Sequence, residues 1–453
     1  MQEQRKSIHG EWSNRWIFVL AATGSAVGLG NIWKFPYITG QNGGGAFVLV
    51  YLLCIACIGI PIMMSEVLLG RRGRQSPINT MKMLAAQEGR SSKWVFLGWS
   101  GVVAGFLILS YYSVIAGWAL AYVYDTAIGT FTGLDKEAVG KIFSDLTANP
   151  TQLIFWHSLF MLMTMIIVGR GVKRGLEAAI RYLMPALFLL LIIMVGYAFT
   201  TGAFAEGFAF LFAPDFSKIT WVGVLIAMGH AFFTLSLGMG AIMIYGSYMP
   251  HDASITRTSI IVAGADTVVA LLAGMAIFPI VFANHLEPSA GPGLIFTTLP
   301  IAFGEMPGGL FFGTVFFILL VLAAWSSSIS LIEPAVAWMV ENKGMTRVKA
   351  SVISGVVTWI VGLGTVLSFN AWSEKKFFGK TFFGVLDFLT SNIMLPLGGL
   401  FIAIFAAWIM KRETTMDELE MGDGPAYQSW RFLVRFITPI AVIIVFLNAI
   451  GLI

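Results

Sequence analysis

The stretch GSAVGLGNIWKFPY at residues 24–37 combines residue types that could bind an ion and a carboxylate side by side. It lies within the first long apolar segment, yet it contains three glycines, an asparagine, a lysine and a proline. Backbone groups freed by a break cannot stay unpaired in lipid, so they must line a protein cavity. Freed carbonyls suit a hard cation such as Na⁺, and freed N–H groups at a helix start suit a carboxylate. The stretch therefore predicts a binding site at mid-membrane depth.

A second break is predicted in GHAFFTLSLGMGAIMIYGSY at residues 229–248, where Ser236, Gly238 and Gly240 interrupt another apolar segment. The two broken segments are five helices apart in order, which suggests two repeats of inverted topology. Interrupted segments at matching positions in two halves point to a transporter binding site. Glycines can also mark close helix packing, as in Gly24-x-x-x-Gly28. Packing alone does not explain two breaks that each carry hydrogen-bonding residues.

The elements that must position these breaks are membrane helices. The chain has 453 residues, of which 57% are hydrophobic and 11% are charged, so lipid must be the solvent of most of it. Apolar runs of helix-spanning length predict an all-α polytopic membrane protein with helices at 15–39, 44–69, 95–125, 152–169, 177–200, 219–247, 255–283, 309–340, 348–368, 381–410 and 430–452. We expect one transport domain over 1–453, divided into repeat 1 (15–200), repeat 2 (219–410) and an added eleventh helix (430–452).

Charge predicts the orientation of these helices. With the N-terminus inside, most of the 28 Lys and Arg residues fall in cytoplasmic segments, in clusters such as Arg71, Arg72 and Arg74 or Arg170, Lys173, Arg174 and Arg181. Eleven helices then put the C-terminus outside. The net charge of +4 reflects this topology and does not indicate nucleic-acid binding. The polar, basic start has no cleavage pattern, so we expect no signal peptide.

Three further segments have simpler readings. Segment 284–308 is rich in Pro and Gly but keeps apolar groups, as expected of an outer loop that packs back onto the protein, either as a lid or as a plain connection. Segment 411–429 is the most charged and reads as a cytoplasmic connection. Cys54 and Cys57 form a CxxC on an apolar helix, where small packing residues are favoured over a redox or metal pair.

At this point the sequence closely resembles the neurotransmitter:sodium symporter family, whose fold is named after the bacterial leucine transporter. The resemblance covers essentially the whole chain and rests on GSAVGLGNIWKFPYITGQNGGGAF, GIPIMMSEVLLGR, SYYSVIAGW, FFTLSLGMG, SSSISLIEP and LDF. It implies two inverted five-helix repeats plus one helix, with helices 1 and 6 broken. The eleven-helix form looks like bacterial members that carry hydrophobic L-amino acids across the plasma membrane.

The resemblance also implies ion sites, residue by residue. One sodium would be held by the carbonyl of Ala26 and the side chains of Asn31 and Thr234, with the substrate carboxylate as a further ligand. The second would be held by the carbonyls of Gly24, Val27 and Ala323 and the hydroxyls of Ser326 and Ser327. The family often has threonine where Ser326 stands, and either residue supplies an oxygen. Such hard neutral ligands suit Na⁺ better than a transition metal.

For the substrate, the resemblance implies that the carboxylate meets the N–H groups of Leu29 and Gly30 and the hydroxyl of Tyr112. The ammonium would meet carbonyls near Ala26 and Phe233. The matching side-chain pocket is Ile108, Phe233, Ser236, Met239, Ser327 and Leu331. Thr234 is also expected at the substrate site, where it would lie beside the first sodium. Met239 is adaptable where a rigid aromatic often sits, so substrates from leucine-sized to tryptophan-sized are expected. By periodicity alone, Tyr112 and Phe233 would be core residues.

Ionisable residues within membrane helices are functional candidates. Asp266 lies where chloride-dependent relatives use a neutral residue beside a chloride, so its carboxylate would replace that anion and would also contact the first sodium. A buried structural pair is the plainer alternative. Lys34 and Asp387 match the family's outer gate, although arginine is common in place of Lys34, and a lone lysine can simply snorkel.

On the inner side, Trp12 matches an N-terminal latch, Glu341 matches its acidic partner, and we group Tyr248 with these gate residues. At the position of the family's usual basic partner this sequence has His9, with Arg5 and Lys6 nearby. Three residues therefore remain as possible partners of Glu341. Glu66 is expected to hydrogen-bond the broken backbone of helix 6. Gly175 and Pro185 bracket the start of helix 5, where local unwinding would let water reach the second sodium.

Other classes of function are less well supported. Gly98-Trp-Ser-Gly101 is the GxSG string of intramembrane serine proteases, in which Ser100 would need a histidine base, and only His157 and His230 look embedded. A channel would need a continuous pore, which broken inverted helices do not predict. Proton coupling through Asp266 or Glu66 is a closer rival to sodium coupling. We expect no catalytic residues, two sodium ions, and a monomer that suffices for transport.

Overall fold

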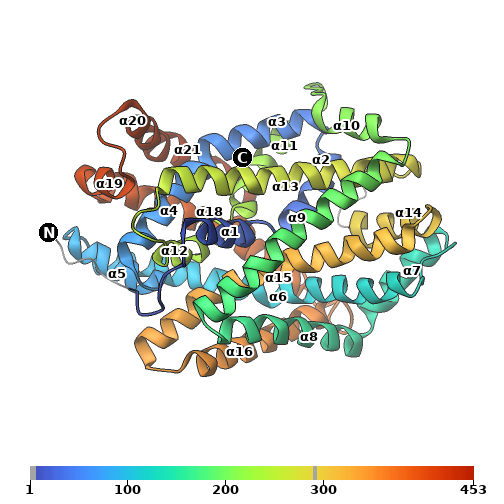
Figure 1. The fold of residues 1–453 in the computed structure, drawn as a ribbon, viewed down its shortest axis with the longest axis horizontal. Helices are drawn as coiled ribbons and strands as arrows, with labels where there is room; N and C mark the ends of the chain where they lie inside the picture. Colours follow the sequence, from blue (N-terminus) through green and yellow to red (C-terminus); the bar gives the residue numbers. More distant parts are fainter. Residues whose placement is uncertain (1–6, 289–292, 453) are drawn as a thin grey trace.

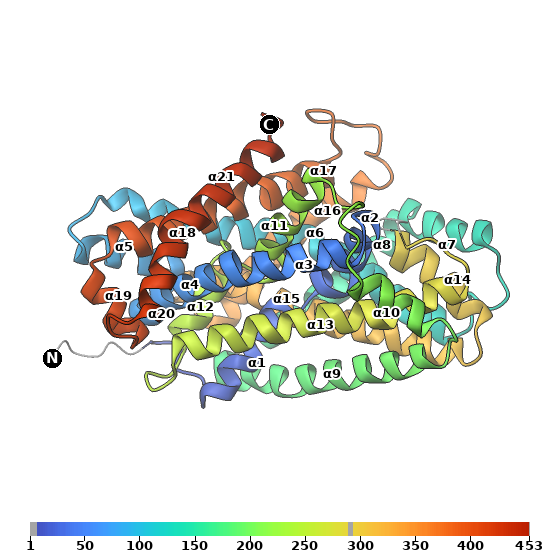
Figure 2. The ribbon, with the colours of Figure 1, turned by 90° about the horizontal axis from the view of Figure 1, so that it is seen from above.

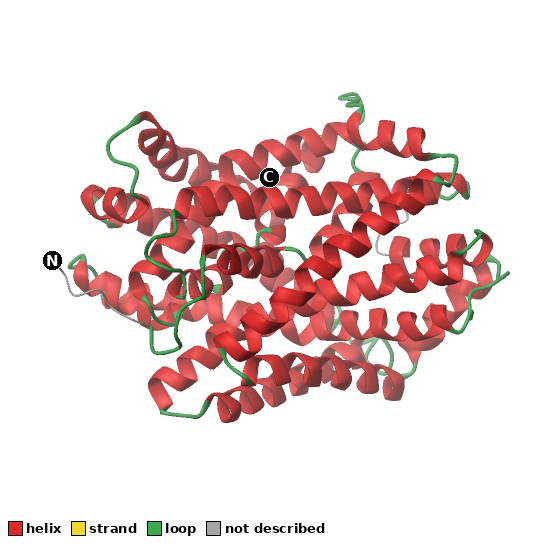
Figure 3. Ribbon diagram, viewed as in Figure 1, coloured by secondary structure: helices red, strands yellow, loops and turns green. Residues whose placement is uncertain are grey.

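The computed structural model describes residues 7–288 and 293–452, and within these ranges the chain is helical with no strand beyond two isolated bridges (Figure 3). In chain order the α-helices are α1 (Arg15–Ala26), α2 (Phe35–Gln41), α3 (Gly45–Cys54), α4 (Ile60–Gly73), α5 (Pro77–Gln87), α6 (Val95–Ala127), α7 (Lys136–Ala148), α8 (Pro150–Gly169), α9 (Ala178–Phe199), α10 (Phe204–Phe212), α11 (Trp221–Thr234), α12 (Ala241–Ser247), α13 (Ile255–Ala283), α14 (Leu299–Glu305), α15 (Gly309–Lys343), α16 (Arg347–Ser368), α17 (Phe382–Asp387), α18 (Leu395–Ile404), α19 (Arg412–Leu419), α20 (Pro425–Phe432) and α21 (Thr438–Ala449).

Short π-helical turns join several of these helices into longer ones. They are η1 (Gly30–Lys34), η2 (Ile55–Gly59), η4 (Val172–Glu177), η5 (Leu294–Thr298), η6 (Phe388–Met394), η7 (Phe405–Ile409) and η8 (Leu433–Ile437), and η3 (Ser92–Trp94) is a 3₁₀ turn. Such turns are usually short insertions within α-helices and are frequent at functional sites. Here η1 lies at the first break, and η4 lies at the start of the fifth long helix.

The spans agree with the eleven segments expected from hydropathy, with one qualification. In the described ranges nine continuous helices are long and apolar enough to cross a membrane, and the pair 15–26 and 30–41, bent by 51°, makes a tenth. The remaining segment, 219–247, is divided into α11 and α12, each too short to cross alone. The predicted break is therefore also the reason that this segment does not form one continuous membrane-spanning helix.

Both breaks have local causes in the sequence. After α1, Val27 adopts an extended conformation, and its N–H still bonds to the Thr23 carbonyl at 2.7 Å. Between α11 and α12, positive φ angles at Ser236 (54°), Gly238 (80°) and Gly240 (76°) turn the chain out of helical geometry. Glycine adopts such angles without steric cost. Gly238 is further constrained, because a Cβ there would lie 2.4 Å from the Leu395 carbonyl oxygen.

Two long helices, α6 and α15, form the middle of the molecule. Their most apolar windows are 83% buried, whereas that of the last span, 425–449, is 22% buried. Helices α8, α9 and α16 pack against this pair. Figures 1 and 2 show α5, α19 and α20 gathered at one end of the long axis and α7, α10 and α14 at the other. We refer to these as the α5 end and the α7 end.

The described residues of segment 284–308 pack back onto the protein, as expected. Residues 294–305 form η5 and α14, and Leu294, Ile295, Phe296 and Leu299 are buried. The Tyr122 hydroxyl donates to the Phe296 carbonyl at 2.8 Å, and the Phe296 ring stacks on Phe143 at 5.6 Å. These contacts tie the segment to α6 and α7 at the α7 end.

Candidate functional site

The first break brings together one carboxylate and two neutral polar side chains. Asn31 Nδ2 donates to Asp266 Oδ1 at 2.7 Å and lies 3.1 Å from Thr234 Oγ1, which donates to Asp266 Oδ2 at 2.9 Å. The Asn31 amide oxygen accepts the N–H of Gly28 at 3.0 Å. All three side chains are buried. The residues expected around the first sodium thus converge from η1, α11 and α13, with Ala26 at the end of α1.

The set expected around the second sodium also converges, between α1 and α15. Ser327 Oγ lies 3.0 Å from the Val27 carbonyl oxygen and 3.4 Å from that of Gly24. Ser326 Oγ lies 3.0 Å from the Ala323 carbonyl oxygen and 3.5 Å from that of Val27. The cluster thus offers neutral oxygens from carbonyls and hydroxyls. Neutral hard oxygens of this kind suit an alkali cation.

The substrate set surrounds one small cavity, to which every expected residue except Thr234 contributes. The cavity measures about 30 Å³ and is lined by Ser25, Ala26, Gly28, Leu29, Gly30, Ile108, Tyr112, Phe233, Ser236, Met239, Ser327 and Leu331. The Tyr112 hydroxyl accepts the Leu29 N–H at 3.2 Å. A volume of this size holds one or two water molecules. An amino acid can therefore enter only if wall side chains move.

Two wall residues, Ser25 and Gly28, were not singled out from the sequence as pocket residues. Ser25 donates its hydroxyl to Ser330 at 2.7 Å, and its carbonyl accepts the Ser236 hydroxyl at 2.9 Å, so it links both breaks to α15. A Cβ at Gly28 would lie 2.5 Å from Ser327 Oγ and 2.8 Å from the Tyr112 hydroxyl. Both residues lie within the GSAVGLG motif, which was the sequence feature that could have identified them as pocket residues.

A larger cavity lies above this pocket, toward the α7 end. It measures about 340 Å³, and its wall includes Trp33, Lys34, Tyr111, Trp118 and Asp387. Leu29, Tyr112 and Phe233 line both cavities, so these side chains form the partition between them. Lys34 Nζ lies 4.4 Å from the centroid of the Phe233 ring, a cation–π geometry. Although Lys34 and Asp387 share this cavity, no direct ion pair joins these two described residues.

Trp12, the residue expected to form a latch, is held by several contacts at the α5 end. Trp12 is 2% exposed, and its indole N–H donates to the Tyr245 carbonyl at 3.2 Å while its backbone N–H donates to the Tyr248 carbonyl at 2.9 Å. Its ring packs edge-on against both tyrosines. The Tyr248 hydroxyl donates to Glu333 at 2.7 Å. The N-terminal segment is therefore fixed to α12 and, through it, to α15.

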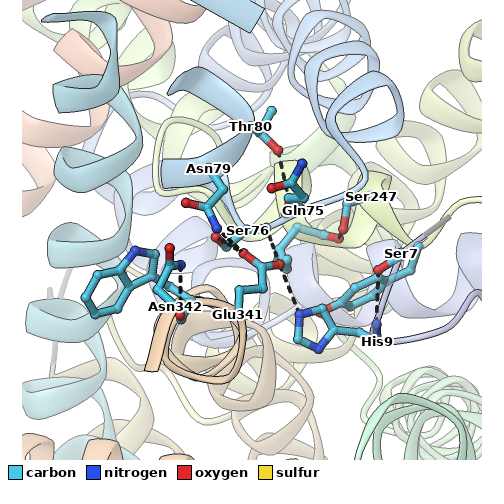
Figure 4. Close-up of polar contacts among 12 residues, drawn as sticks. Ser7, His9, Gln75, Ser76, Asn79, Thr80, Ser247, Glu341 and Asn342 are labelled. Carbon is cyan, nitrogen blue, oxygen red and sulfur yellow. Dashed lines mark hydrogen bonds and ion pairs between the residues drawn. The ribbon is translucent and has the colours of Figure 1, made fainter. Parts of the chain in front are cut away.

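The partner of Glu341 is His9, whose Nε2 lies 3.0 Å from Glu341 Oε1. Figure 4 shows that Glu341 also receives hydrogen bonds from the backbone N–H of Ser76 at 2.8 Å and from the Asn79 amide at 2.8 Å. Arg5 and Lys6 lie outside the described residues. Of the three basic residues considered as partners of Glu341, His9 is thus the one that the structure places beside its carboxylate.

Glu66 lies at the second break, as expected. It is fully buried in α4 and accepts backbone N–H groups from Gly238 at 3.0 Å and Met243 at 3.3 Å. These donors lack helical partners because the chain leaves helical geometry there. Burying them unpaired would cost roughly 1–3 kcal/mol each, so this carboxyl group stabilises the break.

The start of the fifth long helix also departs from α-helical geometry. Gly175 lies within the π-helical turn η4, and a Cβ there would lie 2.1 Å from the Ile167 carbonyl oxygen. Pro185 lies inside α9. Unwinding itself remains a prediction, but the turn already mixes α- and π-type hydrogen bonds, since the Gly171 carbonyl accepts the N–H groups of both Gly175 and Leu176 at 3.0 Å.

The protease alternative does not fit the arrangement around Ser100. Ser100 lies on α6. His157 interacts instead with Ser113 at 3.0 Å and with the Trp359 carbonyl at 3.2 Å, and the His230 ring packs between Phe35 and Tyr51. Neither embedded histidine is hydrogen-bonded to Ser100.

Broken helices with oxygen clusters beside a cavity are typical of secondary transporters, and comparison with known proteins identifies the class. The sequence profile of the Sodium:neurotransmitter symporter family matches residues 9–133 and 137–452. The chain belongs to this family and has the leucine-transporter fold of two inverted repeats with broken first and sixth helices. The family comprises sodium-coupled transporters, not enzymes.

Individual relatives agree with this assignment. The chain is 40% identical to the uncharacterized sodium-dependent transporter YhdH of Bacillus subtilis over 445 residues, covering 98% of each chain. It is 36% identical to an uncharacterized sodium-dependent transporter of Haemophilus influenzae, covering 96% of this chain and 97% of that one. The crystal structure of MhsT in complex with L-phenylalanine superposes with a TM-score of 0.90 at 45% identity, covering 97% of this chain and 99% of that chain.

Proposed function

We propose that this sodium-coupled transporter imports hydrophobic L-amino acids, from leucine-sized to tryptophan-sized, without requiring chloride. The observation that carries the proposal is the link between the Asn31–Thr234–Asp266 cluster and the small cavity: Gly28, in the cavity wall, donates its N–H to the Asn31 amide oxygen at 3.0 Å. An ion at the cluster and a carboxylate at the cavity would lie close enough to stabilise each other. This mutual stabilisation couples the two solutes, since each raises the affinity for the other.

Two sodium ions are supported by two separate oxygen clusters. Ala26, Asn31, Thr234 and Asp266 would hold the first ion, and the substrate carboxylate would complete its ligands. Gly24, Val27, Ala323, Ser326 and Ser327 would hold the second. Within each cluster the polar groups now bond to one another at 2.7–3.5 Å. Sodium would replace some of these mutual contacts with ligand bonds.

The substrate assignment rests on the chemistry of the small cavity. Ile108, Phe233, Met239 and Leu331 supply an apolar wall, which favours an apolar side chain. Leu29, Gly30 and Tyr112 supply donors for a carboxylate at the positive end of a helix. MhsT, which shares 45% of its sequence with this chain, is described in complex with L-phenylalanine. Met239 would adapt its shape to substrates of different size.

Chloride independence is supported by the position of Asp266. Its carboxylate oxygens lie 2.7 Å from Asn31 Nδ2 and 2.9 Å from Thr234 Oγ1. A fixed negative charge there would balance the sodium ion, so an additional anion would have no charge left to neutralise. Binding chloride beside this carboxylate would also be opposed by like-charge repulsion.

The transport cycle follows from which contacts open. With sodium and substrate bound, Phe233 and Lys34 would close over the pocket and Lys34 would approach Asp387. At the α5 end, Trp12 would leave Tyr245 and Tyr248, and the His9–Glu341 contact would break. We expect α6, α8, α15 and α16 to serve as the scaffold while the helices that carry the breaks rock against it. Each charge moved inward gains about 2.3 kcal/mol per 100 mV.

We infer that the α7 end faces the outside and that the protein lies in the bacterial plasma membrane with its N-terminus in the cytoplasm. The basic clusters around Arg71 and Arg170 lie toward the latch, which agrees with the positive-inside bias. We expect one chain to suffice for transport, because both ion clusters and the cavity lie within it.

The experiment is uptake of labelled L-leucine and L-tryptophan into proteoliposomes. External Na⁺ is replaced by K⁺ in one arm, chloride by gluconate in a second, and the sodium gradient by a proton gradient in a third. Uptake that requires Na⁺ and persists in gluconate is the expected result. Uptake driven by protons alone would point to Asp266 or Glu66 as the proton carrier. Failure to transport any hydrophobic amino acid would contradict the pocket assignment.

A further inference from the structure

A third cavity, separate from the two described above, lies between α8, η4, α9 and α15 near the latch end. It measures about 460 Å³, and its apolar wall includes Met163, Ile166, Ala179, Leu183 and Trp325. Ile166 is 46% exposed and Tyr182, at its edge, is 75% exposed, so the groove opens on the apolar perimeter of the molecule. We call this cavity the α8–α9 groove.

The mouth of the α8–α9 groove carries two arginines, Arg170 and Arg174. Neither is in an ion pair among the described residues, and Lys173 between them is also exposed. Their basic neighbours differ: Arg181 pairs with Glu177 at 3.0 Å and Arg347 pairs with Glu333. The mouth therefore combines uncompensated positive charge with an apolar interior.

We propose that the α8–α9 groove binds an anionic phospholipid, with its phosphate between Arg170 and Arg174 and one acyl chain along the apolar wall. Basic pockets between membrane helices recognise anionic head groups in this way. Arg170 lies seven positions after Met163, about 10 Å along a helix, so the groove would cover the part of an acyl chain nearest the head group. The arginines lie toward the latch, since Ser13 donates its N–H to Glu177 of η4 at 3.2 Å.

Such a lipid would contact the elements that support the second ion cluster. Gly175 of η4 lines the groove, as do Leu183 and Trp325. Leu183 precedes Met184, whose sulfur would lie 2.9 Å from a Cβ at Gly24, and Trp325 precedes Ser326. A bound acyl chain would add contacts to the folded turn, because Gly175 lines the groove, so the lipid should stabilise the turn.

The test is binding of palmitoyl-oleoyl phosphatidylglycerol to the purified full-length protein, measured by native mass spectrometry, with the matching phosphatidylcholine as the neutral lipid. The wild type should retain the anionic lipid in preference to the neutral one. The double variant R170Q/R174Q should bind it about thirtyfold more weakly, as expected from two charges near a membrane surface. The variant K82Q/K93Q removes two exposed charges on α5 and η3 and should bind like the wild type.

Two further measurements locate the bound lipid. Ala179→Trp fills the groove without changing charge and should also weaken phosphatidylglycerol binding. Hydrogen exchange at amides 172–179 should slow when phosphatidylglycerol is added to the wild type and not when it is added to R170Q/R174Q. Equal retention of both lipids, unchanged binding by Ala179→Trp, or equal losses in the two double variants would overturn the proposal. Monodispersity in gel filtration checks that each variant is folded, and no readout depends on which solute is transported.

Discussion

In the proposed mechanism, the carboxylate of Asp266 contacts the first sodium ion and takes the place of a chloride ion. It bonds to Asn31 at 2.7 Å and to Thr234 at 2.9 Å, within α13 where no lipid or bulk water reaches it. A hydrogen bond to a charged group contributes roughly 1.5–3 kcal/mol. The negative charge of Asp266, rather than the shape of its side chain, should therefore contribute most to sodium binding.

Asp266→Asn should weaken sodium binding by about tenfold or more, since about 1.4 kcal/mol corresponds to a factor of ten. Chloride should partly restore binding, because an anion could then occupy the space beside the neutral amide. The measurement is a sodium titration of labelled L-phenylalanine binding in chloride and in gluconate. Glu137→Gln, on exposed α7, is the control. An unchanged titration in both salts would remove Asp266 from the ion site.

Trp12 and Trp16 offer a matched pair four residues apart at the start of the chain. Trp12 is 2% exposed in the latch, whereas Trp16 is 56% exposed. Trp12→Ala should open the α5 end and lower the apparent affinity for external L-phenylalanine by about tenfold, because fewer molecules occupy the binding-competent state. Amides of α12 should exchange faster. If Trp16→Ala had the same effect, the latch contacts would not be its cause.

At the scale of elements, the break between α11 and α12 depends on Gly238. An alanine there would need a positive φ and would place its Cβ 2.4 Å from the Leu395 oxygen and 2.9 Å from the Gly399 nitrogen. Gly238→Ala should cost at least about 2 kcal/mol, since a left-handed residue alone costs roughly 1–2 kcal/mol. A lower thermal midpoint in detergent is the readout. Gly264→Ala, in open space on α13, should leave the midpoint nearly unchanged.

Unwinding at the start of the fifth long helix is better tested by substituting Pro185 than by substituting Gly175. A Cβ at Gly175 would collide with the Ile167 carbonyl, so alanine there would displace α8 as well as stiffen η4. Pro185→Ala restores a helical N–H and should slow sodium release at the α5 end by several-fold while external binding stays unchanged. Sodium efflux from loaded proteoliposomes measures this step. Unaltered efflux would argue against unwinding as the release route.

At the scale of the whole molecule, orientation is the property to measure. In a Cys54→Ser, Cys57→Ser background, Gly140→Cys on α7 and Leu452→Cys near the C-terminus should react with a membrane-impermeant thiol reagent on intact cells. Lys349→Cys, at the start of α16, should react only after lysis. The reverse pattern would invert the proposed topology and the direction of import.

Much of this architecture was predictable from local sequence. The spans follow from apolar runs of membrane length, and the breaks follow from glycine-rich motifs at matching positions. The family motifs predicted that Asn31 and Thr234 share one ion site, and the position of Asp266 within a membrane helix predicted that its carboxylate contacts the same ion or forms a buried structural pair. The sequence predicted that segment 284–308 folds back onto the protein. It did not predict that Phe296 is the residue that packs onto α6 and α7.

The sequence by itself thus determined the helical class, the two breaks and the residue types available at each. Only the tertiary structure decided that His9 meets Glu341, that Lys34 covers Phe233 instead of bonding to Asp387, and that Ser25 joins both breaks to Ser330. The reason is physical: local periodicity records whether a residue can be buried, but a hydrogen bond between residues 9 and 341 depends on how whole helices pack. The cavity of about 30 Å³ is likewise a product of packing, because its size depends on the side-chain positions of several helices at once.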